Sequence, residues 1–270
     1  MNNINRFRIY FLIFVMSFPM LCRTQNSNTM DKTNAKLVPV ELSPIDEFSD
    51  VALTISYITG RKIKDMTITD IYTNERRTIV SISYDELGRP ITFTDNYTDS
   101  KTYDISYSQD SIIVTMTEFE GEDCSVLDAT YFLDSSGKAV KATYTSEEGY
   151  VIFNYYDNNN IKSIRNMRSD EQSENSYVYD NDKRAIAENI DIPQWLVLHF
   201  HRRLEKDVFG FLFYLQNNIV ETHFGYTEVP LLTRYSFDDK TGFPVKWAEK
   251  LHDDDPEYTD IMSVKYVLIE

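Results

Sequence analysis

The chain has 270 residues, of which 42% are hydrophobic and 14% aromatic, so it can bury the core of one or two globular domains. Its 43 acidic residues outnumber 27 basic ones and give a net charge of -16, which argues against nucleic-acid binding because such a surface repels phosphate backbones. The acidity could also serve a metal ion or a basic partner, but solubility is its usual role.

The first 24 residues have the pattern of an export signal. Two arginines in MNNINRFR precede the apolar run IYFLIFVMSFPML, which is too short to span a bilayer comfortably. We therefore predict a signal peptide over residues 1–24. Cys22 is a lipidation candidate, but Leu21 replaces the small residue that lipoprotein processing normally requires, so ordinary cleavage a few residues later is the alternative. Cys124 is then left alone, and no disulfide framework is expected.

The remainder of the chain is divided into a flexible linker over residues 25–45 and a single β-rich domain over residues 46–270. The domain consists mainly of predicted β-hairpins, of which SYDELGRPITF (residues 83–93) is the clearest. Apolar residues alternate with polar ones before each turn, a period of two that is typical of strands. Related turns recur every 23 to 25 residues, at Asp85, Asp110, Asp134, Asp157 and Asp180.

The turn residues are interpreted as structural. An aspartate can accept hydrogen bonds from the backbone ahead of it, and a glycine three or four residues later can take the positive φ that the turn needs. Asparagines replace that glycine after two of the aspartates. The spacing lacks the ligands of a calcium loop, so metal binding is not expected. The predicted turn formers are Asp85, Gly88, Asp134, Gly137, Asp157, Asp180, Asp238 and Gly242.

One segment, residues 191–216 (DIPQWLVLHFHRRLEKDVFGFLFYLQ), has the pattern of a helix inserted between strands. Asp191 is a candidate N-cap, and Pro193 lies near the first turn. An apolar stripe at steps of four predicts that the helix plugs or covers an open end of the sheet, and a partner-binding helix is the alternative. The stripe consists of Leu196, Phe200, Leu204, Val208 and Leu212.

Motifs for catalysis are missing from the sequence. His199 and His201 diverge by about 200° on a helix, so they cannot chelate one metal together and are expected to be partly exposed. His252 opens the acidic run HDDDPE, which is interpreted as a solvated hairpin tip. No nucleophile elbow, phosphate-binding loop or HExxH motif occurs. We therefore predict no catalytic residues, no metal site and no cofactor.

Aromatic residues on the predicted strands are the candidate ligand contacts. Nineteen tyrosines and sixteen phenylalanines give wide sheet faces that could stack on sugar rings or hold a lipid. Tyrosine also simply suits a half-buried pleated surface, which is the alternative. The candidates for ligand binding are Tyr103, Tyr107, Tyr144 and Tyr155.

Three sequence motifs of this chain resemble those of a known protein family. NIDIPQWL, DVFGFLFYL and PLLTRYSFDDKTGFPVKW, in that order, resemble a family of exported Bacteroides-type proteins of unknown function with a porin-like β fold. This resemblance implies a barrel-like antiparallel sheet in the periplasm or at the outer membrane, and it supplies no catalytic residues. NNIVETHFGYTEVP departs from the more basic, glycine-containing link anticipated there. The hairpins also resemble the tyrosine-aspartate repeats of wrapping shell proteins, at the turn only.

The sequence as a whole predicts a mainly β fold, with an antiparallel meander of hairpins forming a barrel-like or strongly curved sheet and one helical segment. The strands are too short and too often charged for a membrane pore, so any membrane contact would be through a lipid anchor. We expect a non-catalytic envelope protein that binds a glycan, a lipid or a protein partner, or that has a structural role. The alternative is a hydrolase with two carboxylates about 5 to 9.5 Å apart in a cleft.

Overall fold

The computed structural model describes residues 35–44, 51–97, 100–118, 124–168, 172–181, 183–203, 212, 216–250 and 258–269. The predicted signal peptide with Cys22, His252, and the helical positions Leu204 and Val208 lie outside the described residues. The linker prediction for residues 25–45 needs a correction, because Lys36–Pro44 form the first strand, β1. β1 pairs with the last strand along its whole length and thereby closes the sheet.

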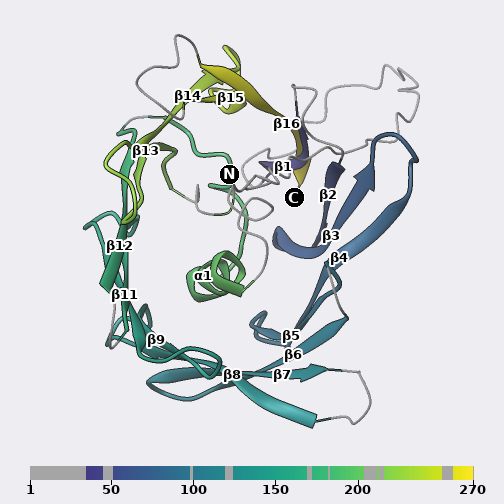
Figure 1. Ribbon diagram of the computed structural model, residues 1–270. Coiled ribbons are helices and arrows are strands. Elements are labelled where there is room, and N and C mark those ends of the chain that lie inside the picture. Colours follow the sequence, from purple (N-terminus) through teal and green to yellow (C-terminus); the bar gives the residue numbers. More distant parts are fainter. Residues whose placement is uncertain are drawn as a thin grey trace, which may run out of the picture.

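The described residues form a closed barrel of sixteen antiparallel strands in which every strand pairs with its neighbours in the chain (Figure 1). This confirms the predicted antiparallel meander of hairpins and settles that it is a barrel. The strands are β1 Lys36–Pro44, β2 Val51–Ile58, β3 Lys62–Asp70, β4 Arg76–Tyr84, β5 Pro90–Asp95, β6 Lys101–Tyr107, β7 Ser111–Glu118, β8 Cys124–Leu133, β9 Ala139–Tyr144, β10 Tyr150–Tyr155, β11 Ile161–Met167, β12 Gln172–Tyr179, β13 Ile219–His223, β14 Leu231–Phe237, β15 Pro244–Lys250 and β16 Thr259–Ile269.

The antiparallel order gives the barrel two distinct ends. We call one of them the turn end, because it carries the turns 85–89, 134–138, 156–160 and 238–243. Even-numbered strands end there, and odd-numbered strands begin there. The hairpins at 71–75 and 145–149 and the loop 224–230 lie at the other end, which we call the mouth end.

Aspartate side chains hold three turns of the turn end in the manner that the sequence predicts. The Asp85 carboxylate accepts hydrogen bonds from the backbone N–H groups of Leu87 and Arg89, at 3.0 and 2.8 Å. Gly88 has φ +75°, a left-handed conformation that favours glycine. Asp134 and Asp238 accept backbone hydrogen bonds in the same way.

Two predicted turn aspartates behave differently. In the turn between β10 and β11, Asn159 takes the left-handed conformation, with φ +68°, and the Asn158 side chain accepts a hydrogen bond from the Asn160 N–H; among the described residues none donates to the Asp157 carboxylate. Asp180 does not form a hairpin turn, because β12 leads into the inserted segment. Its carboxylate instead accepts hydrogen bonds from the backbone and side chain of Asn218, and so joins the two ends of the insertion.

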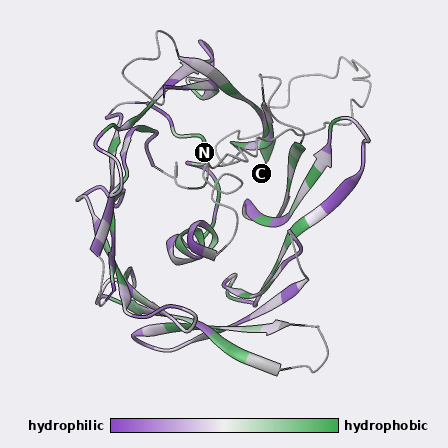
Figure 2. Ribbon diagram, in the orientation of Figure 1, coloured by the Kyte–Doolittle hydropathy of each residue, from purple (hydrophilic) through white to green (hydrophobic). Residues whose placement is uncertain are grey.

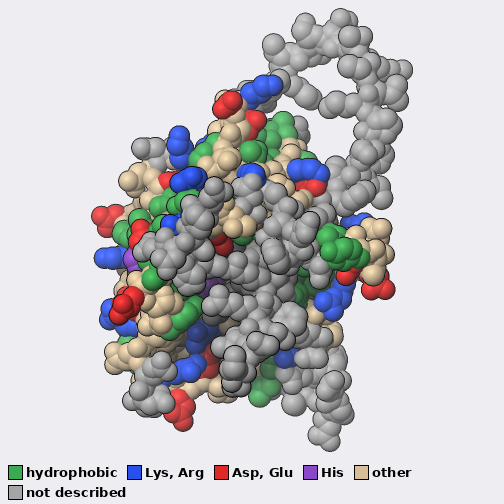
Figure 3. All heavy atoms as spheres, turned by 45° about the horizontal axis from the view of Figure 1, so that its top comes forward, with side chains coloured by type: hydrophobic (Ala, Val, Ile, Leu, Met, Phe, Trp, Pro, Cys, Tyr) green, Lys and Arg blue, Asp and Glu red, His purple; other side chains and the backbone are tan. Residues whose placement is uncertain are grey.

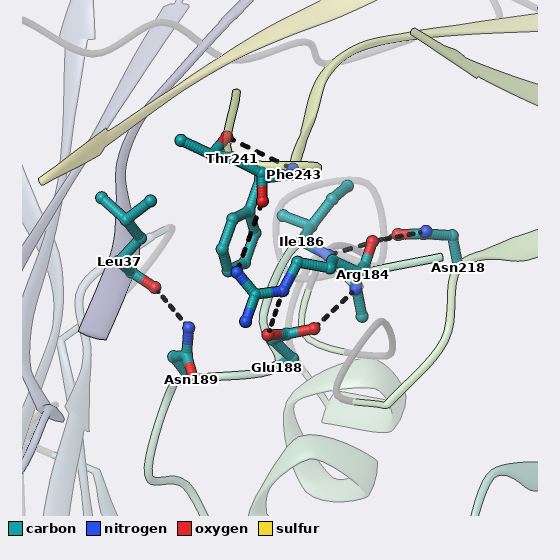
Figure 4. A network of polar contacts seen from close by, with 9 residues as sticks. Leu37, Arg184, Ile186, Glu188, Asn189, Asn218, Thr241 and Phe243 are labelled. Carbon is teal, nitrogen blue, oxygen red and sulfur yellow. Dashed lines mark hydrogen bonds and ion pairs between the residues drawn. The ribbon is translucent and has the colours of Figure 1, made fainter. Parts of the chain in front are cut away.

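The insertion is fastened to the turn end by a network around Arg184 (Figure 4). The Arg184 guanidinium lies 4.4 Å from the ring centroid of Phe243 and forms an ion pair with Glu188 at 3.1 Å. The buried Asn218 side chain accepts a hydrogen bond from Ile186 N–H and donates one to the Arg184 carbonyl. The chain therefore enters the barrel at a fixed position, before the helix begins.

Helix α1, Gln194–Arg203, lies inside the ring of strands (Figure 1). This helix was predicted, but Asp191 does not cap it. The Asp191 carboxylate forms an ion pair with Lys62, and the Pro193 carbonyl accepts the first helical hydrogen bond, from Leu196 N–H at 3.0 Å. Leu196 and Phe200 are buried in the core, as the apolar stripe predicts. The described part of the chain contains no helix that is long and apolar enough to span a bilayer.

Hydrophobic and hydrophilic residues are interspersed along the strands of the barrel (Figure 2), and on many strands buried positions alternate with exposed ones. In β6, for example, Tyr103 and Ile105 are buried while Asp104 is exposed between them. Arg165 and Glu174 form an exposed ion pair at 2.8 Å between β11 and β12. Charged side chains are spread over the face shown in Figure 3.

Tyrosines form a belt around the turn end. In the described part of the chain, six of them lie toward the ends of even-numbered strands, and each donates its hydroxyl hydrogen to a carbonyl near the start of the preceding strand. The pairs are Tyr57 with Pro39, Tyr84 with Ile63, Tyr107 with Pro90, Tyr155 with Ala139, Tyr235 with Ile219 and Tyr266 with Pro244. The belt bonds neighbouring strands to one another beyond the backbone ladder.

The tyrosine belt predicts a loss of stability at alkaline pH. Burial raises the pKa of Tyr107 to about 12, and it also raises the pKa values of Tyr57, Tyr84 and Tyr266 well above the usual value for tyrosine. Unfolded tyrosines ionise near pH 10, so this stabilisation is fully present below about pH 10 and is lost as the pH rises through the folded-state values. We expect these tyrosines to ionise only as the barrel unfolds, measured by tyrosinate absorbance and circular dichroism together. Ionisation of every tyrosine near pH 10 with an intact barrel would contradict this.

Candidate functional site

The C-terminal half of α1 faces strands β9 to β12 across a cavity of about 200 Å³ near the mouth end, which we call the mouth pocket. Sites for drug-sized ligands occupy roughly 300–1,000 Å³, so the mouth pocket suits something smaller. Its apolar lining is Val151, Phe153, Ile164 and Leu198. Its polar and aromatic lining is Tyr144, Asn166, Ser173, Asn175, His201, Arg202 and Tyr226.

A buried polar chain supports one wall of the pocket. The Tyr144 hydroxyl lies 3.0 Å from that of Tyr131, which lies 3.1 Å from Nδ1 of His199, and Nε2 of His199 lies 3.7 Å from the Asp128 carboxylate. His199 was expected to be partly exposed, but it is fully buried because its face of α1 packs against the ring of Phe93. These side chains are all buried, and their chain of polar contacts holds Tyr144 at the pocket wall.

Two arginines share one carboxylate at the edge of the pocket. Glu147, in the hairpin between β9 and β10, accepts hydrogen bonds from Arg202 of α1 and from Arg168, which follows β11, the latter at 3.0 Å. Partial burial favours the neutral form of Glu147, but the hydrogen bonds from the two arginines outweigh burial and hold the pKa of this carboxyl below its usual range. The cluster of three therefore carries a net charge of +1 at neutral pH.

Two buried polar atoms on the pocket lining lack a protein partner. Within the described part of the chain, neither Oδ1 of Asn166 nor Nε of Arg202 makes a hydrogen bond. The rest of each side chain is held in place, because Asn166 Nδ2 donates to Ser173 Oγ at 3.1 Å and Arg202 pairs with Glu147. Leaving such an atom unsatisfied costs about 1–3 kcal/mol, so both side chains would be stabilised by a further hydrogen-bond partner.

An exposed aromatic ring stands at the opening of the pocket. Tyr226, in the loop between β13 and β14, is 81% exposed and stacks on Phe224 with 5.4 Å between ring centroids. The loop is held by hydrogen bonds from Gly225 N–H to Asn175 Oδ1 at 3.1 Å and from Thr227 N–H to the Phe224 carbonyl. The ring is therefore a supported platform beside the polar lining.

A larger groove of about 550 Å³ lies at the turn end, between the N-terminus of α1 and two hairpin turns. Three of its polar side chains already donate hydrogen bonds to neighbouring residues. Lys138 Nζ donates to Asn159 Oδ1, Gln194 donates to the Asn159 carbonyl at 3.0 Å, and Asn160 donates to Asn217 at 2.9 Å. Since these groups satisfy one another, the smaller mouth pocket is the better candidate for a polar ligand.

Of the four tyrosines that the sequence nominates, only Tyr144 lines the mouth pocket. Tyr103 stacks on Phe93 in the core, with ring centroids 4.4 Å apart, and Tyr107 and Tyr155 belong to the tyrosine belt. These three lie in packed surroundings rather than on an open aromatic face.

Sequence reasoning missed the remaining polar and aromatic lining, above all Asn166, Arg202 and Tyr226. The described residues hold no cluster of three or more His, Cys, Asp or Glu side chains that could bind a metal ion.

Among the solved structures that are similar to this chain are two porin-like proteins. One, from Bacteroides uniformis, is 15% identical with a TM-score of 0.43, and the match covers 88% of this chain and 98% of the other. The second, from Bacteroides vulgatus, is 12% identical with a TM-score of 0.40, and the match covers 86% of this chain and 99% of the other. No protein-family model matches this chain, and no curated protein matches it either. The resemblances to a family and to tyrosine-aspartate repeats stay predictions.

Proposed function

We propose that this chain is an exported, non-catalytic protein of the cell envelope that binds a single sugar residue of a glycan in the mouth pocket. Export is supported by the N-terminal sequence, with its two arginines ahead of an apolar run. Of the glycan, lipid and protein partners that the sequence leaves open, a sugar fits the small volume and mixed lining best.

The observation that carries this proposal is the exposed Tyr226 ring beside a pocket lined with amide and hydroxyl groups. A sugar ring presents C–H groups on its faces and hydroxyl groups around its edge. The faces suit an aromatic platform, and the hydroxyl groups suit side chains that both donate and accept, such as Asn166, Asn175 and Ser173.

The lining argues for binding over hydrolysis. Glycoside cleavage needs two carboxyl groups facing the scissile bond, one of them with a raised pKa. The described residues that line the mouth pocket include no aspartate or glutamate. The nearby Glu147 has a lowered pKa and is held by two arginines, which is the opposite of what a general acid requires.

Replacing Tyr226 tests the proposal. We expect Tyr226→Ala to weaken sugar binding by about 1 kcal/mol, or about fivefold, because the stacking face is lost. The measurement is ligand-observed NMR titration with glucose and glucuronate. Tyr72→Ala is the matched control, since Tyr72 is 71% exposed in a different hairpin of the mouth end. Equal affinities of Tyr226→Ala and the unmodified protein for both sugars would refute the site, as would the absence of any sugar binding.

A further inference from the structure

The mouth pocket contains an excess of positive charge in a protein whose net charge is -16. Arg202 and Arg168 meet a single carboxylate, that of Glu147, and His201 adds a ring that becomes cationic when protonated. The described ion pairs join both guanidinium groups to the Glu147 carboxylate, although Glu148 lies on the same hairpin and lines the same hollow. A neutral sugar would leave this charge unused.

Arg202 has hydrogen-bonding capacity to spare. A guanidinium carries five N–H donors in a planar fork, and the Glu147 carboxylate engages Nη2. Nε is buried and lacks a hydrogen bond among the described residues. The guanidinium also lies 5.7 Å from the ring centroid of Tyr144, within range of a cation–π contact. A cationic N–H donor forms a stronger, charge-assisted hydrogen bond with a carboxylate than with a hydroxyl group.

Asn166 provides a hydrogen-bond acceptor near the donors of Arg202. Its Oδ1 is a buried acceptor without a partner among the described residues, so the bound molecule must also present a donor, such as a sugar hydroxyl. A molecule that satisfies both Arg202 and Asn166 therefore carries an anionic group and a hydroxyl group within a volume of about 200 Å³.

We infer that the ligand is an acidic sugar, a hexuronic acid residue whose carboxylate binds Arg202 and whose hydroxyl groups reach Asn166. This inference rests on the proposed function and goes further by stating the substrate class. The carboxylate of the ligand competes with Glu147 for the same guanidinium groups, so Glu147 limits the affinity in the free protein.

The test uses glucuronate and glucose as probes, each titrated by ligand-observed NMR into the full barrel. We expect glucuronate to bind about tenfold more tightly than glucose, because a carboxylate on a guanidinium is a charge-assisted pair. Arg202→Gln should remove most of that preference, and Arg202→Lys should retain part of it. Arg165→Gln, which breaks an ion pair on the outer wall, should leave both affinities unchanged.

Glu147→Gln separates a binding role from a structural one. Both Arg202→Gln and Glu147→Gln lose the same ion pair, so a merely structural role would weaken binding in both variants. We expect Glu147→Gln to tighten glucuronate binding several-fold instead, since it frees Arg202 and Arg168 and removes a repelling charge.

Equal affinity of the unmodified protein for glucose and glucuronate would overturn the acidic-sugar inference and leave the sugar site standing. Weaker glucuronate binding by Glu147→Gln would also overturn the inference. Binding of neither sugar would overturn the proposed function itself.

Discussion

Truncating Phe200 to alanine should destabilise the barrel by about 3–5 kcal/mol, the cost of removing a large aromatic side chain from a packed core. Phe200 is 0% exposed and meets the ring of Phe93 edge to face, with centroids 5.3 Å apart. Because it belongs to α1, its loss weakens the contact between the inserted helix and the wall. The measurement is chemical denaturation followed by circular dichroism.

Phe132→Ala is the matched control for this change. Phe132 lies on the outer face of β8, where it is 39% exposed and contacts the Lys141 ammonium at 5.4 Å from the ring centroid. Removing a side chain of the same type from this surface should cost less than about 1 kcal/mol. If Phe200→Ala cost as little as the expected loss in Phe132→Ala, the Phe200 ring would not contribute to a packed core between the helix and the wall.

The local pattern of the sequence predicts the hairpins because each one is specified within about ten residues. Asp85 and Gly88 lie close enough in the chain for turn chemistry to define both their roles. Closure is a different kind of property, because it depends on pairing between Lys36 and Ile269 at opposite ends of the sequence. No local pattern records that register, which is why the sequence left a curved sheet as the alternative.

In the helix, local sequence pattern predicts some buried positions, and packing against the barrel wall decides the others. The apolar stripe correctly predicts that Leu196 and Phe200 are buried, but it treats His199 as the partly exposed neighbour. Inside a barrel a helix is surrounded by strands, so a polar position such as His199 can be buried as well. His199 then requires the Tyr131 hydroxyl as a partner, which comes from a strand 68 residues earlier in the chain.

The mouth pocket was beyond sequence reasoning for a related reason. Its lining comes from β9 to β12, from α1 and from the loop after β13, and each contribution looks ordinary in isolation. Asn166 and Asn175 are polar residues of strands, and Arg202 follows a helical histidine. One weak signal was available, since Tyr226 lies in NNIVETHFGYTEVP, the link that departs from the family resemblance.

Gly149 is the backbone position on which the edge of the mouth pocket depends, and alanine there should be strongly destabilising. Gly149 has φ +92°, and a Cβ atom added to it would lie 2.0 Å from the carbonyl oxygen of Met167. The obstacle is backbone, so β11 or the hairpin carrying Glu147 must move. Backbone strain and the clash together should cost at least about 2–3 kcal/mol, and glucuronate binding should change as well, because Glu147, which pairs with Arg202, lies beside the clash.

Gly137→Ala distinguishes the clash from the cost of the backbone conformation alone. Gly137 has a similar φ of +81°, but a Cβ atom added to it would have no neighbour within 4 Å, and it is at the turn end, away from the pocket. Its replacement should cost about 1 kcal/mol and leave sugar binding intact. Thermal unfolding and glucuronate titration of the two variants together make the comparison. Equal losses of stability would mean that φ alone sets the cost, and that the hairpin carrying Glu147 can shift without disturbing β11.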